Sequence, residues 1–361
     1  MTGDTPISGN LDTFPKLLAE NARVRGDKPA SREKDFGIWL SWTWGQVAEE
    51  VRAIACGLAA LGVKRGDKVT ICGDNRPHLY WSMTAVQALG AIPVPVYQDS
   101  VPDEMQYIYE HAEAKFAIVE NQEQVDKLLE IRDRAPDLEH IVYKFPRGMR
   151  NYDQPFLDLL ADIEERGRAF DRENPDFYED SVAQSTGADI AIMLYTSGTT
   201  GRPKGVVYTH RGAYLNALGE MIEVGGSVYM NYLWTLPMFH CNGWCYTWGV
   251  TALGGRHVCL RANQPAEIFR LIREEKISHF CAAPTVLIGL ANDPAAKEGP
   301  FSQPVTIMTA GAPPSPTIIS AMEEELGATV VHGYGLTETY GPHTVCAWHP
   351  EWDDLPAGER A

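Results

Sequence analysis

The sequence predicts an α/β protein with two subdomains built on mostly parallel sheets. Short apolar runs, typical of buried strands, alternate with segments of helical period, and the alternation occurs twice along the chain. Parallel strands need crossover connections, which helices on the faces of a sheet provide, so this alternation favours βαβ units. The 361 residues leave room for two or three compact units of about 150 residues. We expect the first subdomain at 1–190 and the second at 191–361.

The first half begins with a capped amphipathic helix and continues as alternating elements. Thr43 is a suitable N-cap, and Gly62 a suitable C-terminal residue, for a helix whose apolar positions form one stripe. That stripe consists of Val47, Val51, Ile54, Leu58 and Leu61. Strands are then expected at 68–72, 92–96 and 116–119, with helices at 79–89 and 103–112.

A connection rich in charge, proline and glycine at 146–187, with one helix at 156–166, separates the two halves. An apolar strand-like run at 190–195 follows, and the alternation then resumes. Strands are expected at 232–236, 257–260, 279–282, 305–310 and 329–334, with helices at 214–222, 266–275 and 316–326.

A loop rich in glycine and hydroxyl groups comes directly after the run 190–195. We call residues 196–205 the phosphate loop. Its glycines let backbone N–H groups converge on one anion, its hydroxyls add donors, and Lys204 adds positive charge. The expected phosphate-binding residues are Thr196, Ser197, Gly198, Thr199, Thr200, Gly201 and Lys204.

The phosphate loop does not have the spacing of a Walker loop, its closest rival. Counting from Gly198 places Pro203 where the second glycine should stand, and Gly205 follows Lys204 where serine or threonine is required. A P-loop phosphotransferase is therefore disfavoured. An ordinary hydrophilic turn is disfavoured too, because such turns seldom combine this many glycines and hydroxyls behind an apolar run.

Three segments in order resemble the adenylate-forming superfamily, which comprises acyl-CoA synthetases, aryl-CoA ligases, luciferases and nonribosomal adenylation domains. They are residues 194–205, 236–240 and 333–339. The resemblance implies an acyl-CoA synthetase: a fatty acid of medium or long chain reacts with ATP to give acyl-AMP and pyrophosphate, and coenzyme A then displaces AMP. ATP, Mg²⁺ and coenzyme A are the implied ligands. The implied fold is the N-terminal part of the adenylate-forming enzymes.

The resemblance also implies roles for single residues. Thr196, Lys204, His240 and Glu338 are the expected catalytic residues, and Glu338, a hard oxygen ligand, is the expected Mg²⁺ ligand. His240, taken by itself, is more typical of a packed histidine than of a catalytic one, and it is the resemblance that places it at the site. Trp234, Trp244 and Trp248 are candidate pocket walls or plain core. The expected nucleotide contacts beyond the phosphate loop are Gly311, Ala312, Pro313, His332, Gly333, Tyr334, Gly335 and Thr337.

Composition excludes several other classes. The balance of 31 Lys and Arg against 48 Asp and Glu gives a net charge of −17, which opposes binding to nucleic acid or to anionic lipid. The first eleven residues lack the features of a secretory signal, and no apolar run approaches about 20 residues. We expect a cytoplasmic protein with reduced cysteines, and peripheral membrane contact stays open for a fatty acid substrate. The group His240, Cys241, Cys245 and His257 matches no standard zinc spacing.

Two departures from the family pattern lead to further expectations. The family continues with a barrel subdomain, a hinge and a mobile domain that carries the adenylation lysine, so we expect a truncated N-terminal portion without full activity. Residues 32–39 and 73–76 resemble bacterial long-chain enzymes, whereas 238–244 resemble short- and medium-chain enzymes. We therefore hypothesise a join at the phosphate loop. A noncatalytic nucleotide- or acyl-binding module, and an enzyme that adenylates another carboxylic acid, remain alternatives.

Overall fold

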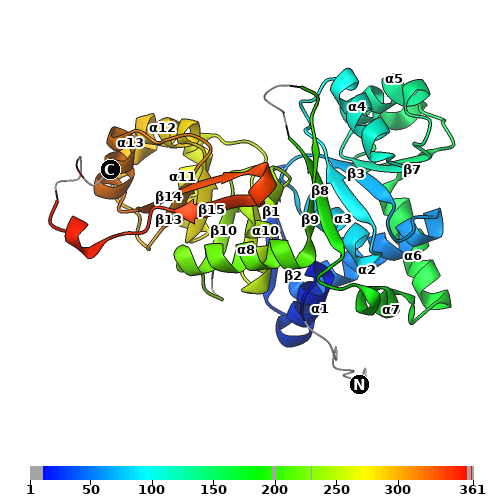
Figure 1. Ribbon diagram of the computed structural model, residues 1–361, viewed down its shortest axis with the longest axis horizontal. Coiled ribbons are helices and arrows are strands. Elements are labelled where there is room, and N and C mark those ends of the chain that lie inside the picture. Colours follow the sequence, from blue (N-terminus) through cyan, green and yellow to red (C-terminus); the bar gives the residue numbers. More distant parts are fainter. Residues whose placement is uncertain (1–10, 197–200, 229, 356–358, 360–361) are drawn as a thin grey trace. The chain divides into compact units, whose positions relative to one another are not determined.

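The computed structural model describes residues 11–196, 201–228, 230–355 and 359. The predicted fold class is confirmed, because helices alternate with largely parallel strands through the described chain (Figure 1). The chain divides into two compact units. The first comprises the residues up to Lys28 together with Trp42–Tyr214, and the second comprises Pro29–Ser41 together with Leu215 onward.

A parallel five-stranded sheet forms the centre of the first unit. Its strand order is β4-β3-β5-β6-β7, and each neighbouring pair is parallel. The strands are β3 Lys68–Cys72, β4 Ile92–Pro95, β5 Phe116–Val119, β6 His140–Tyr143 and β7 Leu157–Leu159. The first three lie where the sequence predicted them. The sequence did not predict β6 and β7, which are only four and three residues long.

Seven helices accompany this sheet among the described residues, and the best predicted of them is α2. They are α1 Phe14–Arg25, α2 Trp44–Leu61, α3 Pro77–Ala88, α4 Pro102–Ala112, α5 Gln122–Ile131, α6 Leu160–Glu173 and α7 Phe177–Gln184. Thr43 caps α2 in a capping box with Gln46, and Gly62 ends it in the left-handed region at φ +111°. Both predicted ends are confirmed.

An antiparallel hairpin completes the first unit and carries the phosphate loop. It consists of β8 Ile190–Tyr195 and β9 Gly205–Thr209. The Gln87 side chain donates to the Ala191 carbonyl at 2.8 Å, which ties α3 to β8. The hairpin therefore groups with the first unit, which includes Trp42–Tyr214.

An eight-stranded sheet forms the centre of the second unit, in the order β15-β14-β13-β12-β10-β11-β1-β2. From β1 to β14 the recorded pairs are parallel, and β15 is antiparallel to β14. The strands are β1 Pro29–Asp35, β2 Ile38–Thr43, β10 Asn231–Trp234, β11 Arg256–Cys259, β12 His279–Ala282, β13 Thr306–Thr309, β14 Thr329–Leu336 and β15 Gly341–Val345.

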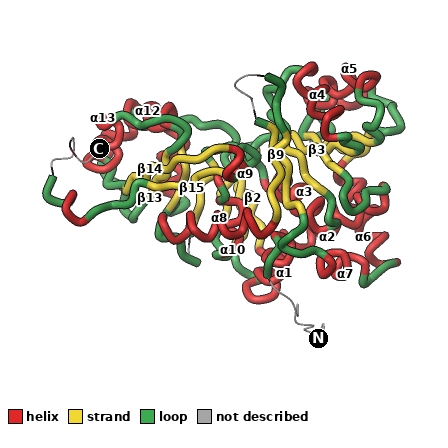
Figure 2. The backbone as a smooth tube through the Cα atoms, in the orientation of Figure 1, coloured by secondary structure: helices red, strands yellow, loops and turns green. Residues whose placement is uncertain are grey.

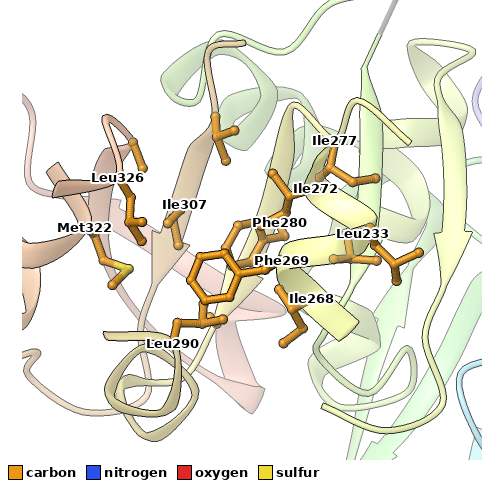
Figure 3. Close-up of a cluster of buried hydrophobic side chains, with 14 of the residues drawn as sticks. Leu233, Ile268, Phe269, Ile272, Ile277, Phe280, Leu290, Ile307, Met322 and Leu326 are labelled. Carbon is orange, nitrogen blue, oxygen red and sulfur yellow. The ribbon is translucent and has the colours of Figure 1, made fainter. Parts of the chain in front are cut away.

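Helices of the second unit cover an apolar core. They are α8 His210–Glu223, α9 Cys241–Trp244, α10 Tyr246–Ala252, α11 Pro265–Glu274, α12 Pro284–Asn292 and α13 Pro316–Ser320, which continues into a π-helical turn at Ala321–Glu325. Phe269 of α11 meets Phe280 of β12 and Leu290 of α12 in this core (Figure 3). Figure 2 separates the strands from the helices of each unit by colour.

Short 3-10 turns lie between several of these elements, and one of them, directly after β14, carries Glu338. The turns are Arg132–Arg134, Met149–Asn151, Pro294–Glu298, Thr337–Thr339 and Pro350–Trp352. Among the described residues, none of the helices combines the length and the apolar character that a membrane span requires.

Two glycines let α2 and α6 cross closely, and this crossing predicts a specific sensitivity. A Cβ atom at Gly167 would lie 1.9 Å from the Ala53 carbonyl oxygen, and one at Gly57 would lie 2.1 Å from the Ile163 carbonyl oxygen. Because backbone atoms cannot yield as a flexible side chain does, we expect Gly167→Ala to lower the free energy of unfolding by about 1–3 kcal/mol. Urea unfolding followed by circular dichroism measures the change.

Gly219 offers the matched control for that substitution. It lies inside α8, and a Cβ atom there would meet nothing within 4 Å. Alanine favours a helix over glycine by roughly 0.5–1 kcal/mol, so Gly219→Ala should leave the protein equally or more stable. Equal effects of the two substitutions would show that the crossing is not tightly packed.

Candidate functional site

The phosphate loop is closed at its base by hydrogen bonds between its two ends. Thr196 N donates to the Lys204 carbonyl at 3.0 Å, and Lys204 N donates to Thr196 Oγ1 at 3.4 Å. Lys204 is exposed. Four of the predicted residues, Ser197, Gly198, Thr199 and Thr200, lie outside the described residues. The chain leaves the loop as strand β9, whereas a Walker loop opens a helix.

Helix α4 holds both ends of the phosphate loop. The Tyr107 hydroxyl donates to the Pro203 carbonyl at 3.0 Å, and the Arg202 guanidinium lies 5.3 Å from the centre of the Tyr107 ring. One turn further along α4, His111 Nδ1 lies 2.8 Å from the Tyr195 hydroxyl. Burial raises the pKa of Tyr195 to about 12, so this hydroxyl keeps its proton at neutral pH. Sequence reasoning missed Tyr107 and His111, whose only signal is their spacing of four on a helix.

The predicted nucleotide residues of the second unit lie at the carboxyl ends of two neighbouring parallel strands, β13 and β14, or directly after them. In the pairing of β13 with β14, Thr309 lies opposite His332, so Gly311 and Tyr334 each come two residues beyond a matched pair. The carboxyl ends of parallel strands meet at one edge of a sheet, where α/β proteins usually bind ligands. Gly311, Ala312 and Pro313 are exposed, and the Tyr334 side chain is 56% exposed. The exposed strip after β13 and the exposed Tyr334 ring near the end of β14 therefore belong to neighbouring strands of one sheet.

Glu338 stands on a tightly bonded turn at the same edge. The hydroxyl of Thr339 accepts from Leu336 N at 2.9 Å and donates to the Gly341 carbonyl at 2.7 Å. The Glu338 side chain itself is exposed. A Cβ atom at Gly335 would lie 1.8 Å from the Gly341 oxygen, so only glycine allows β14 and β15 to approach each other here.

His240 follows β10, which belongs to the same parallel sheet. Its side chain is exposed, but desolvation by the atoms around its ring lowers its pKa below the ordinary value of 6.5. The imidazole is therefore neutral at pH 7. Trp234, Trp244 and Trp248 are buried and belong to the core around this segment.

The Glu338 carboxylate is a donor that suits Mg²⁺. The cysteines and histidines considered as a zinc site, in contrast, are engaged in other contacts. Mg²⁺ is usually held by one or two carboxylates together with phosphate oxygens. His257 lies between Trp234 Nε1 at 3.0 Å and Thr251 Oγ1 at 3.3 Å, and Cys245 bonds to a backbone carbonyl. Within the described part of the chain, no group of three or more His, Cys, Asp or Glu side chains is placed to hold a metal ion.

Comparison with known proteins identifies the family. Residues 18–359 match the model of the AMP-binding enzymes. The chain belongs to the AMP-binding enzyme family. A 4-hydroxybutyrate–CoA ligase of Metallosphaera sedula is 36% identical over 96% of this chain and 61% of its own length. A 2-methylpropanoate–CoA ligase of Humulus lupulus is 37% identical over 89% of this chain and 57% of its own length.

This AMP-binding protein spans about three fifths of the length of those two curated relatives. Each relative aligns with this chain on both sides of the phosphate loop. The similarity to these relatives is therefore explained without the hypothesised join of two different halves at that loop. An anthranilate–CoA ligase solved with anthranoyl-AMP superposes with a TM-score of 0.77 at 24% identity, covering 95% of this chain and 63% of that one. The N-terminal domain of FACL13 from Mycobacterium tuberculosis gives 0.76 at 23%, covering 92% and 78%. These two likenesses show the shared fold.

Glu220 is a buried acid of α8 that the sequence did not single out. Its side chain is 5% exposed, and its Oε2 has no hydrogen-bond partner in the described structure. Desolvation, with a smaller contribution from Glu223, raises its pKa to about 9. The folded protein therefore holds Glu220 protonated at neutral pH, whereas the unfolded chain ionises it near the ordinary value of 4.5.

This difference predicts how stability depends on pH. The contribution of Glu220 is fully present below about pH 4.5, and it is lost as the pH rises through the folded pKa of about 9, because the unfolded state releases the proton first. Glu220→Gln, which is neutral throughout, should therefore raise the melting temperature more at pH 8 than at pH 5. Thermal melts at both pH values measure the difference, and Glu324→Gln on the surface is the control. Equal shifts at the two pH values would contradict the buried, protonated state.

Proposed function

We propose that this chain is the nucleotide-binding portion of an acyl-CoA synthetase, which joins a carboxylic acid to AMP and then to coenzyme A. The observation that carries the proposal is the common sheet edge in the second unit. There an exposed glycine-proline strip follows β13, the exposed Tyr334 lies near the end of the adjacent β14, and Glu338 stands on the turn after β14. That set of groups suits a flat base and a phosphate-bound metal ion.

Each residue set has a distinct task in this proposal. The strip Gly311–Pro313 accepts one face of adenine, because it has little side chain to keep the ring away, and Tyr334 stacks on the other face. Thr196 and Lys204, with the rest of the phosphate loop, hold the triphosphate. Mg²⁺, when bound, neutralises charge that develops as pyrophosphate leaves. Glu338 would hold that ion, with Thr337 beside it for a phosphate oxygen.

In this proposal His240 lies beside the carboxylate of the acid substrate. Because its imidazole is neutral, it can donate or accept one hydrogen bond without pairing permanently with a carboxylate. The carboxylate then remains free to attack the α-phosphorus of ATP, and the new P–O bond forms as the bond to pyrophosphate breaks. The coenzyme A thiol later displaces AMP from the acyl carbon.

The acid we favour is a short aliphatic one. The curated relatives named above act, by their names, on 4-hydroxybutyrate and 2-methylpropanoate, and another from Arabidopsis thaliana is an acetate/butyrate–CoA ligase, 36% identical over 89% of this chain and 57% of its own length. A medium- or long-chain fatty acid, as the sequence suggested, is the alternative.

Substitution of Glu338 tests the nucleotide assignment. Glu338→Gln keeps the size of the side chain but removes its charge, so Mg²⁺ should strengthen ATP binding about tenfold less than in the parent chain. Titration of a fluorescent ATP analogue in Mg²⁺ and in EDTA measures this. Glu351→Gln, an exposed acid on a neighbouring short turn, is the control. A noncatalytic module that binds nucleotide without metal would respond equally to both substitutions.

Substitution of Tyr107 tests the phosphate loop separately. Tyr107→Phe keeps the ring under Arg202 but removes the hydrogen bond to the Pro203 carbonyl. A hydrogen bond contributes about 1 kcal/mol net, so ATP affinity should fall about fivefold. Tyr152→Phe is the matched control, since that hydroxyl bonds to Asp126 elsewhere in the same unit. Unchanged ATP affinity in Tyr107→Phe would show that the hydrogen bond from α4 to the phosphate loop does not contribute to nucleotide binding.

A further inference from the structure

A side-chain amide of α8 reaches the turn that follows Glu338. Asn216 Nδ2 lies 3.0 Å from the Pro342 carbonyl oxygen and 3.4 Å from the Thr339 carbonyl oxygen. Both acceptors are backbone atoms, so the amide nitrogen must be the group that faces them. Asn216 therefore bonds to the chain on both sides of Tyr340 and Gly341, where the turn ends and β15 begins.

A buried thiol bonds to the same turn and to the same amide. Cys245 Sγ donates to the Tyr340 carbonyl at 2.8 Å and accepts from Asn216 Nδ2 at 3.1 Å. The cysteine is fully buried. Asn216, Cys245 and the turn thus form a closed set of hydrogen bonds, which we call the Asn216–Cys245 bridge. Its members come from α8, from the junction of α9 with α10, and from the connection between β14 and β15.

Both backbone segments that the bridge joins are conformationally strained. Gly243, Trp244 and Cys245 lie in succession in the left-handed region, at φ +64°, +50° and +70°. Across from them Tyr340 has φ +66°. Non-glycine residues adopt this region at a cost, and they keep it only where the surroundings impose it.

The two strained segments also touch directly. A Cβ atom at Gly341 would lie 3.1 Å from Trp244 Cα, so a side chain at Gly341 would push the segments apart. The segment 243–245 begins three residues after His240, and the turn contains Glu338. The bridge therefore joins two parts of the second unit: the segment 243–245, which follows His240, and the turn that carries Glu338.

We propose that Asn216 and Cys245 are positioning residues, which fix the Glu338 carboxylate for Mg²⁺ and tie its turn to the His240 segment. The proposal rests on the proposed function, since it takes Glu338 as the metal ligand. Neither residue touches substrate in this scheme. Both are neutral, so they set the geometry of the turn without placing a second charge beside the carboxylate.

The test compares four variants of the 361-residue chain by the ratio of ATP dissociation constants in EDTA and in Mg²⁺. Asn216→Ala and Cys245→Ala each remove the bridge and should lower this ratio about tenfold, as loss of a group that orients a metal ligand does. Cys245→Ser keeps a donor and an acceptor and should preserve the ratio within about twofold. Binding of Mn²⁺ in the presence of ATP, followed by electron paramagnetic resonance, should show the same order of variants.

Thr251→Val is the control for a merely structural role. The buried Thr251 hydroxyl donates to the Thr247 carbonyl at 2.7 Å within α10, and neither residue is a member of the bridge. This variant should lower the melting temperature and leave the ratio unchanged. If Asn216→Ala is too unstable to measure, the contrast between Cys245→Ala and Cys245→Ser decides.

The outcomes separate the two proposals. A parent chain whose ATP affinity does not respond to Mg²⁺ would overturn the proposed function and the bridge's role with it. A responsive parent chain whose ratio is unchanged in Asn216→Ala and Cys245→Ala would overturn the positioning role alone. Equal losses in Cys245→Ser and Cys245→Ala would also overturn it, because the hydrogen bonds would then not be the cause.

Discussion

The parallel pairing of β10, β12, β13 and β14 is the constraint on which the candidate site depends. Because these strands run the same way, the segments that follow them must leave the sheet at one edge. The segments themselves are far apart in the sequence, from His240 to Glu338. The apolar packing of Phe269, Phe280 and Leu290 supports the strand pairing beneath that edge (Figure 3). Core packing therefore places segments that are far apart in the sequence at the ends of neighbouring strands of one sheet.

Two buried titratable side chains of the second unit are held in their neutral forms. Desolvation lowers the pKa of His257 to about 3, and Glu220 keeps its proton. The buried Glu275 is instead paired with Arg32 and Arg256. The exposed Glu338 stands on a turn that hydroxyl, amide and thiol groups fix in place. Neutral donors suit this position, because a fixed charge so near would compete with a cation for the carboxylate.

Sequence periodicity predicted most of the buried strands and the capped helix, since side chains repeat every two residues along a strand and every 3.6 along a helix. It missed β6 and β7 of the first unit. It also missed β1, β2 and β15 of the second, which lie at or near the sheet edges and carry charged or mixed residues. The candidate site residues fall into the same two groups, those that a local sequence pattern reveals and those that it does not. Glu338, Tyr334 and the glycine strip stand in contiguous motifs, and their roles remain proposals. Tyr107, Asn216 and Cys245 gain meaning only from partners more than 25 residues away, which no local pattern reveals.

The hairpin that carries the phosphate loop separates folding from recognition. Its ladder pairs Ile190 with Thr209 and Tyr195 with Gly205, so the strand register is complete before the loop begins. In the proposed function, substitutions at the tip can therefore change the anion that is bound, or its affinity, without shifting the strands that support the loop. The same property makes this hairpin a natural place for grafting loops between relatives.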